Sequence, residues 1–265
     1  MNSKDIIKLA FKNLLSKTTA FRDMHKGESC YILGDGSSIK HFNLESFNNL
    51  ISFGCNYIPF HNDFNKLNSL YCIMSAPFYF TPFGGYEDSI KKRHLYIMSK
   101  HYKKIVYKYP EKNFFFNLSN YPFINKPNTY FNFSNYPSVE KDFISNKINC
   151  FAGVIRHSIS MAIYMGFRNI YLVGCDYTHT PSVRKHWYER GLGEIFELPN
   201  YETDFFKIAS DYAKITTVTV NGESDKLNYI TYEDLTGYKP FYRENNELLS
   251  EVYLNDLKTW PDYFL

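Results

Sequence analysis

One stretch decides the fold: Asn169-Ile-Tyr-Leu-Val-Gly-Cys-Asp-Tyr177. Its apolar run, Ile170–Val173, is β-branched and aromatic and stops at Gly174, which predicts a short buried strand with a polar tip. Just upstream, apolar side chains recur at helical spacing over residues 151–165, and Gly166 follows as a C-cap glycine would. A helix that turns directly into a buried strand is typical of open α/β sheets, in which ligands bind beyond the carboxyl ends of the strands.

Other predicted strands alternate with predicted helices along the chain. The strands span 29–33, 50–58, 69–74, 104–107 and 215–220; helices span 203–213 and 244–260, and 113–137 is interpreted as mostly irregular. Such alternation predicts an α/β, Rossmann-like fold with a mainly parallel sheet and helices on both faces.

Composition restricts the class of protein. The 265 residues carry a net charge of +3, which is too small to indicate nucleic acid as a partner. The five cysteines are widely spaced and odd in number, which favours a reducing compartment over a disulfide framework or zinc module. No secretory signal is visible, and no apolar run approaches the roughly 20 residues of a membrane span. We therefore expect a cytoplasmic protein.

The chain is predicted to have three parts. Residues 1–27 hold an N-terminal amphipathic helix, 28–240 a Rossmann-like domain, and 241–265 a helical tail. Over residues 3–18 of the first part, apolar side chains share one face and lysines lie off it. Two interpretations stay open for that helix: packing on the domain, or peripheral contact with the inner membrane.

Polar and small residues collect where three predicted strands end. Gly34-Asp-Gly-Ser-Ser38 is a loop in which backbone N–H groups can cradle a phosphate, although no Walker sequence follows. The other tips carry Cys55-Asn56 and the run Cys175–His179, and the long helix begins near Ala152-Gly153 with free N–H groups. Together they predict a pocket for a phosphate-bearing ligand.

The polar loop 178–200 holds the best candidate for a general base. His186 lies just beyond a strand tip, and imidazole titrates near neutral pH. His179 is the competing candidate. Arg184 and Lys185 could neutralise a phosphate or carboxylate. Asp176, His179 and His186 do not have a standard zinc spacing, so no metal is expected.

Several of these segments resemble motifs of the bacterial family-42 sialyltransferases. Gly34-Asp-Gly-Ser-Ser38 resembles their G-N-G-P-S turn, and Phe53-Gly-Cys-Asn-Tyr57 resembles their R-C-N-Q-F segment. Phe151-Ala-Gly-Val154, then a helix, then Ile170-Tyr-Leu-Val-Gly-Cys-Asp-Tyr177, resembles their T-S-G-V, helix, I-Y-L-S-G-I-D-F. The resemblance covers residues 28–235 in patches, and it implies that the domain 28–240 binds a nucleotide sugar and is catalytic. The MptE-like family, which includes 6-hydroxymethylpterin pyrophosphokinases, shares the pattern.

The resemblance implies a sialyltransferase-like, GT-A-like variant of the Rossmann fold that uses a CMP-activated sugar without a metal or other cofactor. It implies His186 as the base and Tyr188 as a stabiliser of the leaving phosphate. Implied contacts with the nucleotide sugar come from Gly34, Asp35, Gly36, Ser37, Asn56, Ala152, Gly153, Asp176, Tyr177, Arg184 and Lys185. Asp35 and Ala152 depart from the family's Asn and Ser, and Ala76 stands where a second donor-binding Asn is expected, which leaves the sugar open.

The function expected from these observations is that of an inverting glycosyltransferase of bacterial surface polysaccharide or lipooligosaccharide synthesis. Its donor would carry sialic acid, Kdo or a related nonulosonate, and its acceptor would be a glycan or glycolipid hydroxyl. Expected partners are therefore a nucleotide-sugar donor and a glycan acceptor, with a homo-oligomer left open. Two alternatives remain: an MptE-like pyrophosphokinase that uses ATP and Mg²⁺, and a non-catalytic nucleotide-binding protein of a glycan assembly cluster.

Overall fold

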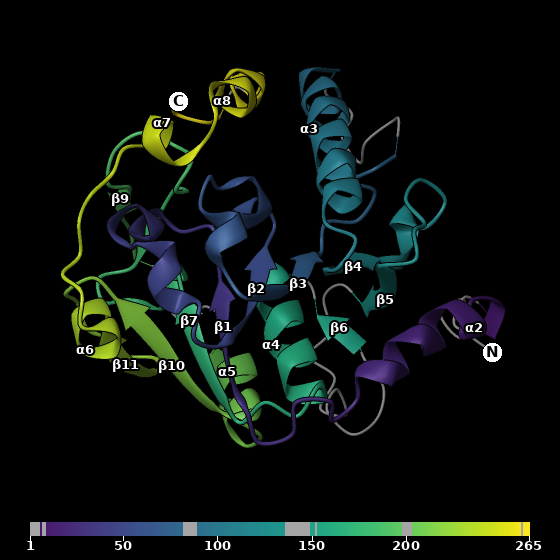
Figure 1. The fold of residues 1–265 in the computed structure, drawn as a ribbon, viewed down its shortest axis with the longest axis horizontal. Helices are drawn as coiled ribbons and strands as arrows, with labels where there is room; N and C mark the ends of the chain where they lie inside the picture. The colour runs from purple at the N-terminus through teal and green to yellow at the C-terminus, as the bar shows by residue number, and fades with distance from the viewer. Residues whose placement is uncertain are drawn as a thin grey trace.

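A computed structural model describes residue 6 and residues 9–81, 89–135, 149–151, 153–197, 203–260 and 262–265. Its centre is a nine-stranded sheet in the order β11-β10-β7-β1-β2-β3-β4-β5-β6, and every neighbouring pair is parallel (Figure 1). The strands are β1 (Ser29–Leu33), β2 (Ile51–Cys55), β3 (Ser69–Met74), β4 (Asn113–Asn117), β5 (Thr129–Asn135), β6 (Asn149–Phe151), β7 (Asn169–Val173), β10 (Lys214–Thr219) and β11 (Asn228–Thr231).

Helices cover both faces of this sheet, as the alternation of elements predicts. Alternate residues of β1 divide between two apolar cores: Cys30 and Ile32 face one, Tyr31 and Leu33 the other. α4 (Val154–Tyr164) and α5 (Thr203–Ser210) contribute to the first core. The second is built by α3 (Ser89–Lys108), α6 (Tyr232–Thr236), α7 (Asn245–Leu248), α8 (Glu251–Leu257) and several short 3₁₀ helices.

The sheet reverses its strand order beside β1. The strands β2 to β6 extend to one side, and β7, β10 and β11 lie on the other. Such a reversal splays the connecting loops apart and leaves a crevice at the carboxyl ends of the two central strands. Here those ends are Leu33 and Val173, which are paired in register, and Gly34 N–H donates to Val173 O over 2.7 Å.

Most predicted elements are confirmed, and two are wrong. The predicted strand over residues 104–107 belongs to the 20-residue helix α3. The supposedly irregular region 113–137 contains the buried strand β4 and the strand β5.

Both predicted terminal helices are interrupted within the described residues, where Ile6, Leu9 and Ala10 are also helical. The predicted C-terminal helix is divided between α7 and α8. At the N-terminus, α2 covers Lys12–Leu15 and a 3₁₀ helix follows over Ser16–Phe21, while residues 1–5, 7 and 8 lie outside the described residues. The proposed three-part division stays a prediction.

Two further observations concern membrane spans and cysteines. Within the part of the chain that the structure describes, no helix combines the length and apolar character needed to cross a membrane. Cys30, Cys55, Cys72 and Cys175 are buried free thiols, and the side chain of Cys150 lies outside the described residues.

Candidate functional site

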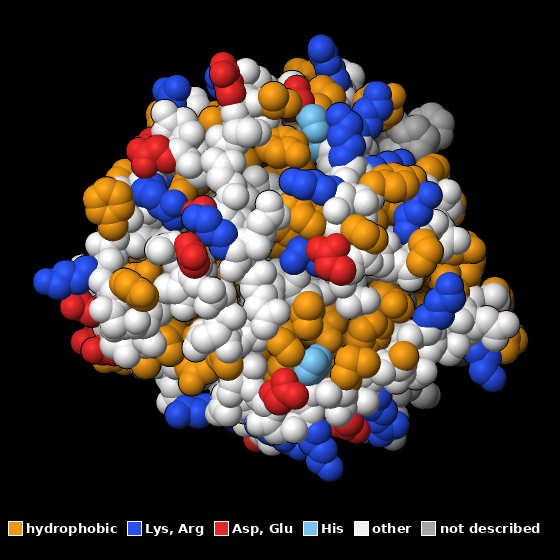
Figure 2. Space-filling view, in the orientation of Figure 1, with side chains coloured by type: hydrophobic (Ala, Val, Ile, Leu, Met, Phe, Trp, Pro, Cys, Tyr) orange, Lys and Arg blue, Asp and Glu red, His pale blue; other side chains and the backbone are white. Residues whose placement is uncertain are grey.

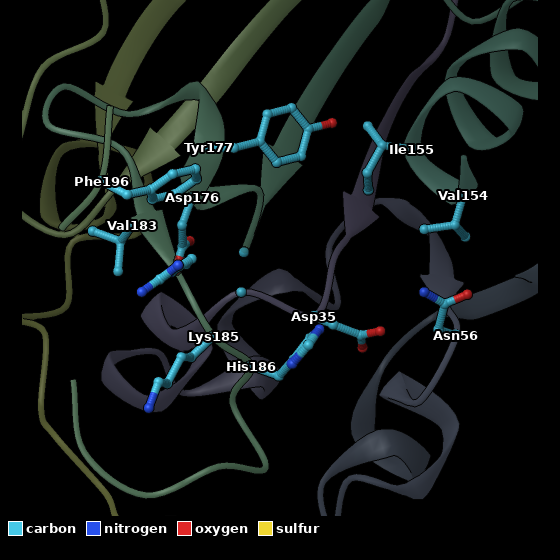
Figure 3. A pocket seen from close by; sticks show the side chains of 13 residues that line it. Asp35, Asn56, Val154, Ile155, Asp176, Tyr177, Val183, Lys185, His186 and Phe196 are labelled. Atoms are coloured by element: carbon cyan, nitrogen blue, oxygen red, sulfur yellow. The ribbon is translucent and has the colours of Figure 1, made fainter. Parts of the chain in front are cut away.

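A cavity of about 380 Å³ opens at the crevice between β1 and β7. Figure 3 shows Asp35, His186 and Asn56 on one side of it and Tyr177, Phe196 and Val183 on the other. The remaining lining residues are Gly36, Val154, Ile155, Gly174, Asp176, Arg184 and Lys185. Most of the residues that the sequence analysis selects therefore meet in one cavity, although they come from segments up to 150 residues apart.

Asp176 fastens the glycine loop to the tip of β7. Its Oδ2 accepts hydrogen bonds from Ser38 N–H at 2.8 Å and Ser37 Oγ at 3.1 Å, and its Oδ1 accepts from Ser38 Oγ at 2.5 Å. The carboxylate is buried and its acceptor sites are largely occupied by these donors. Asp176 thus shapes the cavity. Ser37 helps to hold Asp176 in place but does not line the cavity.

Glycine is required where the loop approaches β7. A Cβ on Gly36 would lie 2.5 Å from Asp176 Cγ, and one on Gly34 would lie 2.5 Å from the carbonyl oxygen of Gly174. Gly174 itself has φ of +70°, a conformation that glycine adopts without strain. The close approach brings Asp35 and Gly36 to the cavity wall, while Gly34 lies outside the lining.

Asp35 is a half-buried carboxyl group at the floor of the cavity. Burial raises its pKa from 3.8 to about 6, against the opposing influence of His186 and of hydrogen bonds from Trp187 and Asn56. Trp187 Nε1 donates to Asp35 Oδ1 at 3.2 Å. A carboxyl group that titrates near neutral pH inside a cavity is typical of a functional site.

His186 is held on the cavity wall through one ring nitrogen. Its Nδ1 lies 2.6 Å from Glu189 Oε1, and its own backbone N–H donates to the same oxygen at 3.0 Å. Burial opposes ionisation of Glu189, but the hydrogen bonds from His186 and from Phe264 N–H outweigh it and lower the pKa of Glu189. Because a carboxylate can only accept, Nδ1 of the neutral ring carries the proton and Nε2 is left as a bare acceptor.

The turn around His186 is fixed from several sides. Tyr188 is buried and stacks on the imidazole, with ring centroids 4.8 Å apart, and its hydroxyl donates to Tyr263 over 3.2 Å. Phe264 adds two hydrogen bonds, one from its N–H to the side-chain oxygen Glu189 Oε2 at 3.1 Å and one from Arg190 N–H to the Phe264 carbonyl at 2.7 Å. Tyr188 does not line the cavity, so its implied contact with a phosphate has no support here.

Lys40 anchors the same turn from below. Its fully buried ammonium group donates to the carbonyl oxygens of Glu189 and Gly191 and pairs with Glu244 at 2.7 Å. Burial lowers the pKa of Lys40, and the partnership with Glu244 counteracts that effect. The base candidate therefore sits on a turn whose carbonyl groups are tied to the domain core.

The two cations predicted to meet a phosphate are paired with a neighbouring carboxylate. They lie on or beside a two-stranded hairpin, β8 (Val183–Arg184) and β9 (Glu194–Ile195). Lys185 Nζ lies 2.9 Å and Arg184 Nη2 lies 2.7 Å from Glu194 oxygens. Figure 3 shows Lys185 extending away from Asp35. An anionic ligand would therefore compete with Glu194 for both cations.

The start of α4 offers further donors. Gly153 is its N-cap, with φ of +101°, and glycine has no side chain with which to cap the helix. Val154 and Ile155 of the first turn line the cavity, so N–H groups of this turn and the positive end of the helix dipole lie at its rim. Ala152 lies outside the described residues.

The sequence analysis missed several residues of this site. Glu189 gave no motif signal because it meets His186 across a single turn. The sequence indicates Val154 and Ile155 only as apolar positions of a helix, and Val183 and Phe196 lie in the loop 178–200, which it indicates as polar. His179, the competing base, does not line the cavity; it is buried, and its Nε2 has no hydrogen-bond partner among the described residues.

Comparison with known proteins gives structural likeness without a family assignment. No model of a protein family matches the sequence, and no curated protein matches it. A glycosyltransferase, MAf from Magnetospirillum magneticum AMB-1, aligns with a TM-score of 0.48 at 12% identity over 94% of this chain and 41% of its own length. The sialyltransferase CstII from Campylobacter jejuni in complex with CMP gives 0.44 at 13% identity, with coverage of 88% and 98%.

An α-2,3-sialyltransferase from Campylobacter jejuni in apo form gives a TM-score of 0.41 at 17% identity, with coverage of 88% of this chain and 95% of its own. Sialyltransferases, whose motifs the sequence resembles, are thus among the solved structures that are similar to this chain.

Proposed function

We propose that this chain is a glycosyltransferase that moves an acid sugar from a CMP-activated donor to a glycan hydroxyl. The observation that carries the proposal is the hydrogen bond of 2.6 Å between His186 Nδ1 and Glu189, on the wall of a cavity at the sheet's reversal point. Nucleotides bind at such reversal points, and an imidazole held through Nδ1 presents Nε2 as a base. The sequence motifs support a CMP-linked sialic acid, Kdo or related nonulosonate as the donor.

The proposed step is a direct displacement. The acceptor hydroxyl gives its proton to His186 Nε2, and its oxygen attacks the anomeric carbon. The bond from that carbon to the phosphate oxygen breaks, and CMP leaves with the electron pair. Glu189 stabilises the imidazolium that forms. A single displacement inverts the anomeric configuration and involves no metal.

Charge on the leaving phosphate would be met by backbone and side-chain donors. The N–H groups of the first turn of α4 lie at the cavity rim, and Asn56 lines the wall beside Asp35. Lys185 and Arg184 would join once the phosphate displaces Glu194 from them. Asp35 fits a ribose hydroxyl better than a phosphate, because a carboxylate would repel the latter.

The first experiment is a thermal-shift screen with CMP, CDP, UDP, GDP and ATP, each with and without Mg²⁺. A ligand that binds only the folded state raises the melting temperature by mass action. Stabilisation by CMP without Mg²⁺ supports the proposal. Stabilisation only by ATP with Mg²⁺ would favour the pyrophosphokinase. The observation that supports this alternative is that two carboxylates, Asp35 and Asp176, line the cavity. Binding of CMP with no transfer from any CMP-sugar would favour a non-catalytic nucleotide-binding protein.

A matched pair of variants tests the base. His186→Ala should abolish transfer from the CMP-sugar that binds, while leaving the thermal shift by CMP in place. His179→Ala, which changes the competing histidine outside the cavity, should retain transfer. If His179→Ala loses transfer and His186→Ala keeps it, the assignment of the base is wrong.

A further inference from the structure

Positive charge is concentrated on one helix of this chain. α3 carries seven Lys and Arg residues and no Asp or Glu. The whole chain has 30 Lys and Arg against 27 Asp and Glu, so the remainder has 23 against 27 and is net negative by 4. A molecule with this asymmetry presents one side to an anionic surface.

The outward face of α3 combines these cations with aromatic rings. Its inward positions Met98, Tyr102 and Ile105 pack into the core. The outward positions recur every three or four residues, and Tyr96 and Tyr107 among them are 47% and 61% exposed. We call the basic face the exposed residues Arg93, Tyr96, Lys100, Lys104, Tyr107 and Lys108.

The basic face contains four cationic side chains. Among the residues that the structure describes, Arg93, Lys100, Lys104 and Lys108 form no ion pair. Lys100 Nζ instead lies 4.2 Å from the ring centre of Tyr96. In Figure 2 Lys and Arg side chains gather at the upper right, where α3 lies in Figure 1, with hydrophobic side chains between them.

Apolar side chains extend this surface beyond α3. Lys126 Nζ stands 4.5 Å from the ring centre of Tyr107, and nearby in sequence Phe123 is 38% exposed. Tyr121 in turn packs edge-to-face against Phe11, which is 37% exposed, and Leu9 just before it is 63% exposed. The segment 121–126 therefore contacts the basic face through Lys126 and contacts Phe11 through Tyr121.

We propose that the basic face of α3 docks this protein on the surface of an anionic phospholipid bilayer. Lysine and arginine supply the attraction to the lipid head groups, and exposed tyrosine and phenylalanine rings are suited to the interface between water and acyl chains. Single-stranded nucleic acid is held in a positively charged groove, whereas this face is the convex side of one helix. The inference does not depend on the reaction that the cavity performs.

The test uses the full chain and vesicles of phosphatidylcholine, with or without 30% phosphatidylglycerol, in a flotation assay at low and high salt. The test variant is Lys100→Glu/Lys104→Glu. The control, Lys207→Glu/Lys214→Glu, makes the same change of net charge at exposed positions of α5 and β10. Circular dichroism establishes that both variants are folded.

We expect binding to the anionic vesicles that weakens with salt and is at least 10-fold weaker on pure phosphatidylcholine. Reversal of two charges on the basic face should reduce the partition coefficient by about 30-fold or more, since each basic residue near the surface contributes about 5-fold. The control should change it by less than about 3-fold. Equal losses in the two variants, no binding to anionic vesicles, or tighter binding to a single-stranded RNA than to the vesicles would each overturn the proposal.

Discussion

Replacement of Asp35 by Asn should change how the stability of this protein depends on pH. The folded state holds the Asp35 proton with a pKa of about 6, whereas the group has a pKa of 3.8 when it is not buried. Between those values the folded state binds more protons than the unfolded state, so stability falls as pH rises through this window. Asn has no proton to lose, and the Asp35→Asn variant should not show this fall.

The magnitude follows from the shift in pKa. About 2 pH units at 1.36 kcal/mol each correspond to a loss of about 3 kcal/mol in the free energy of unfolding. This loss is fully present above pH 6 and absent below pH 4. Because Asp35 is only half-buried, solvent reduces this figure, and we expect about 1.5 to 3 kcal/mol. Any hydrogen bond that Asn makes less well with Trp187 or Asn56 adds an offset that is the same at every pH.

The assay is urea unfolding of both proteins at pH 4.5, 5.5, 7 and 8. Because part of the fall has already occurred at pH 4.5, the free energy of unfolding of Asp35→Asn minus that of the wild type should grow by about 1 to 2 kcal/mol from the lowest to the highest pH. Other titrating groups occur in both proteins and cancel. A difference that stays constant with pH, or that shrinks as pH rises, would refute the view that burial raises the pKa of this carboxyl group.

Three further variants test the architecture of the site. Lys40→Met should cost about 2 to 4 kcal/mol in urea unfolding, because two carbonyl groups and a carboxylate lose their buried cation; an unchanged midpoint would contradict the anchoring role. Gly36→Ala should cost about 1 to 3 kcal/mol and weaken CMP in a thermal-shift titration, because its Cβ meets Asp176; full retention of both would show that the loop has room. Glu189→Gln should lose part of the 10²–10⁴-fold that a general base contributes to turnover, and ¹⁵N NMR should show less of the Nδ1–H tautomer of His186; an unchanged tautomer ratio would remove the positioning role.

Local sequence patterns predicted the sheet well where each strand had clear boundaries. Ser29–Leu33 and Asn169–Val173 are short apolar runs closed by glycine, and both are observed as predicted. The run at 104–107 was misread because four β-prone residues outweighed the longer pattern. Ile105 and Val106 are inward positions of α3, seven or eight residues after Met98, and that spacing is helical. β4 was missed because Phe114, Phe115 and Phe116 are buried on both faces and show no alternation.

The site was predictable where it depends on strand ends and unpredictable where it depends on turns. Parallel strands bring their carboxyl ends together, so Asp35, Asn56 and Asp176 could be grouped from the sequence alone. The carboxylate partner of His186 could not be predicted, because an irregular turn has no periodic sequence pattern from which its geometry follows. The pairing of Lys185 with Glu194 could not be predicted either, because it depends on a hairpin whose two strands have only four residues in total.

The hydrogen bonds between Phe264 and the turn at residues 189–190 have a practical consequence for engineering this protein. Residues 262–265 lie one hydrogen bond from the carboxylate that orients His186. A substitution or a label at these residues would therefore act on the imidazole from a distance, without altering the cavity wall.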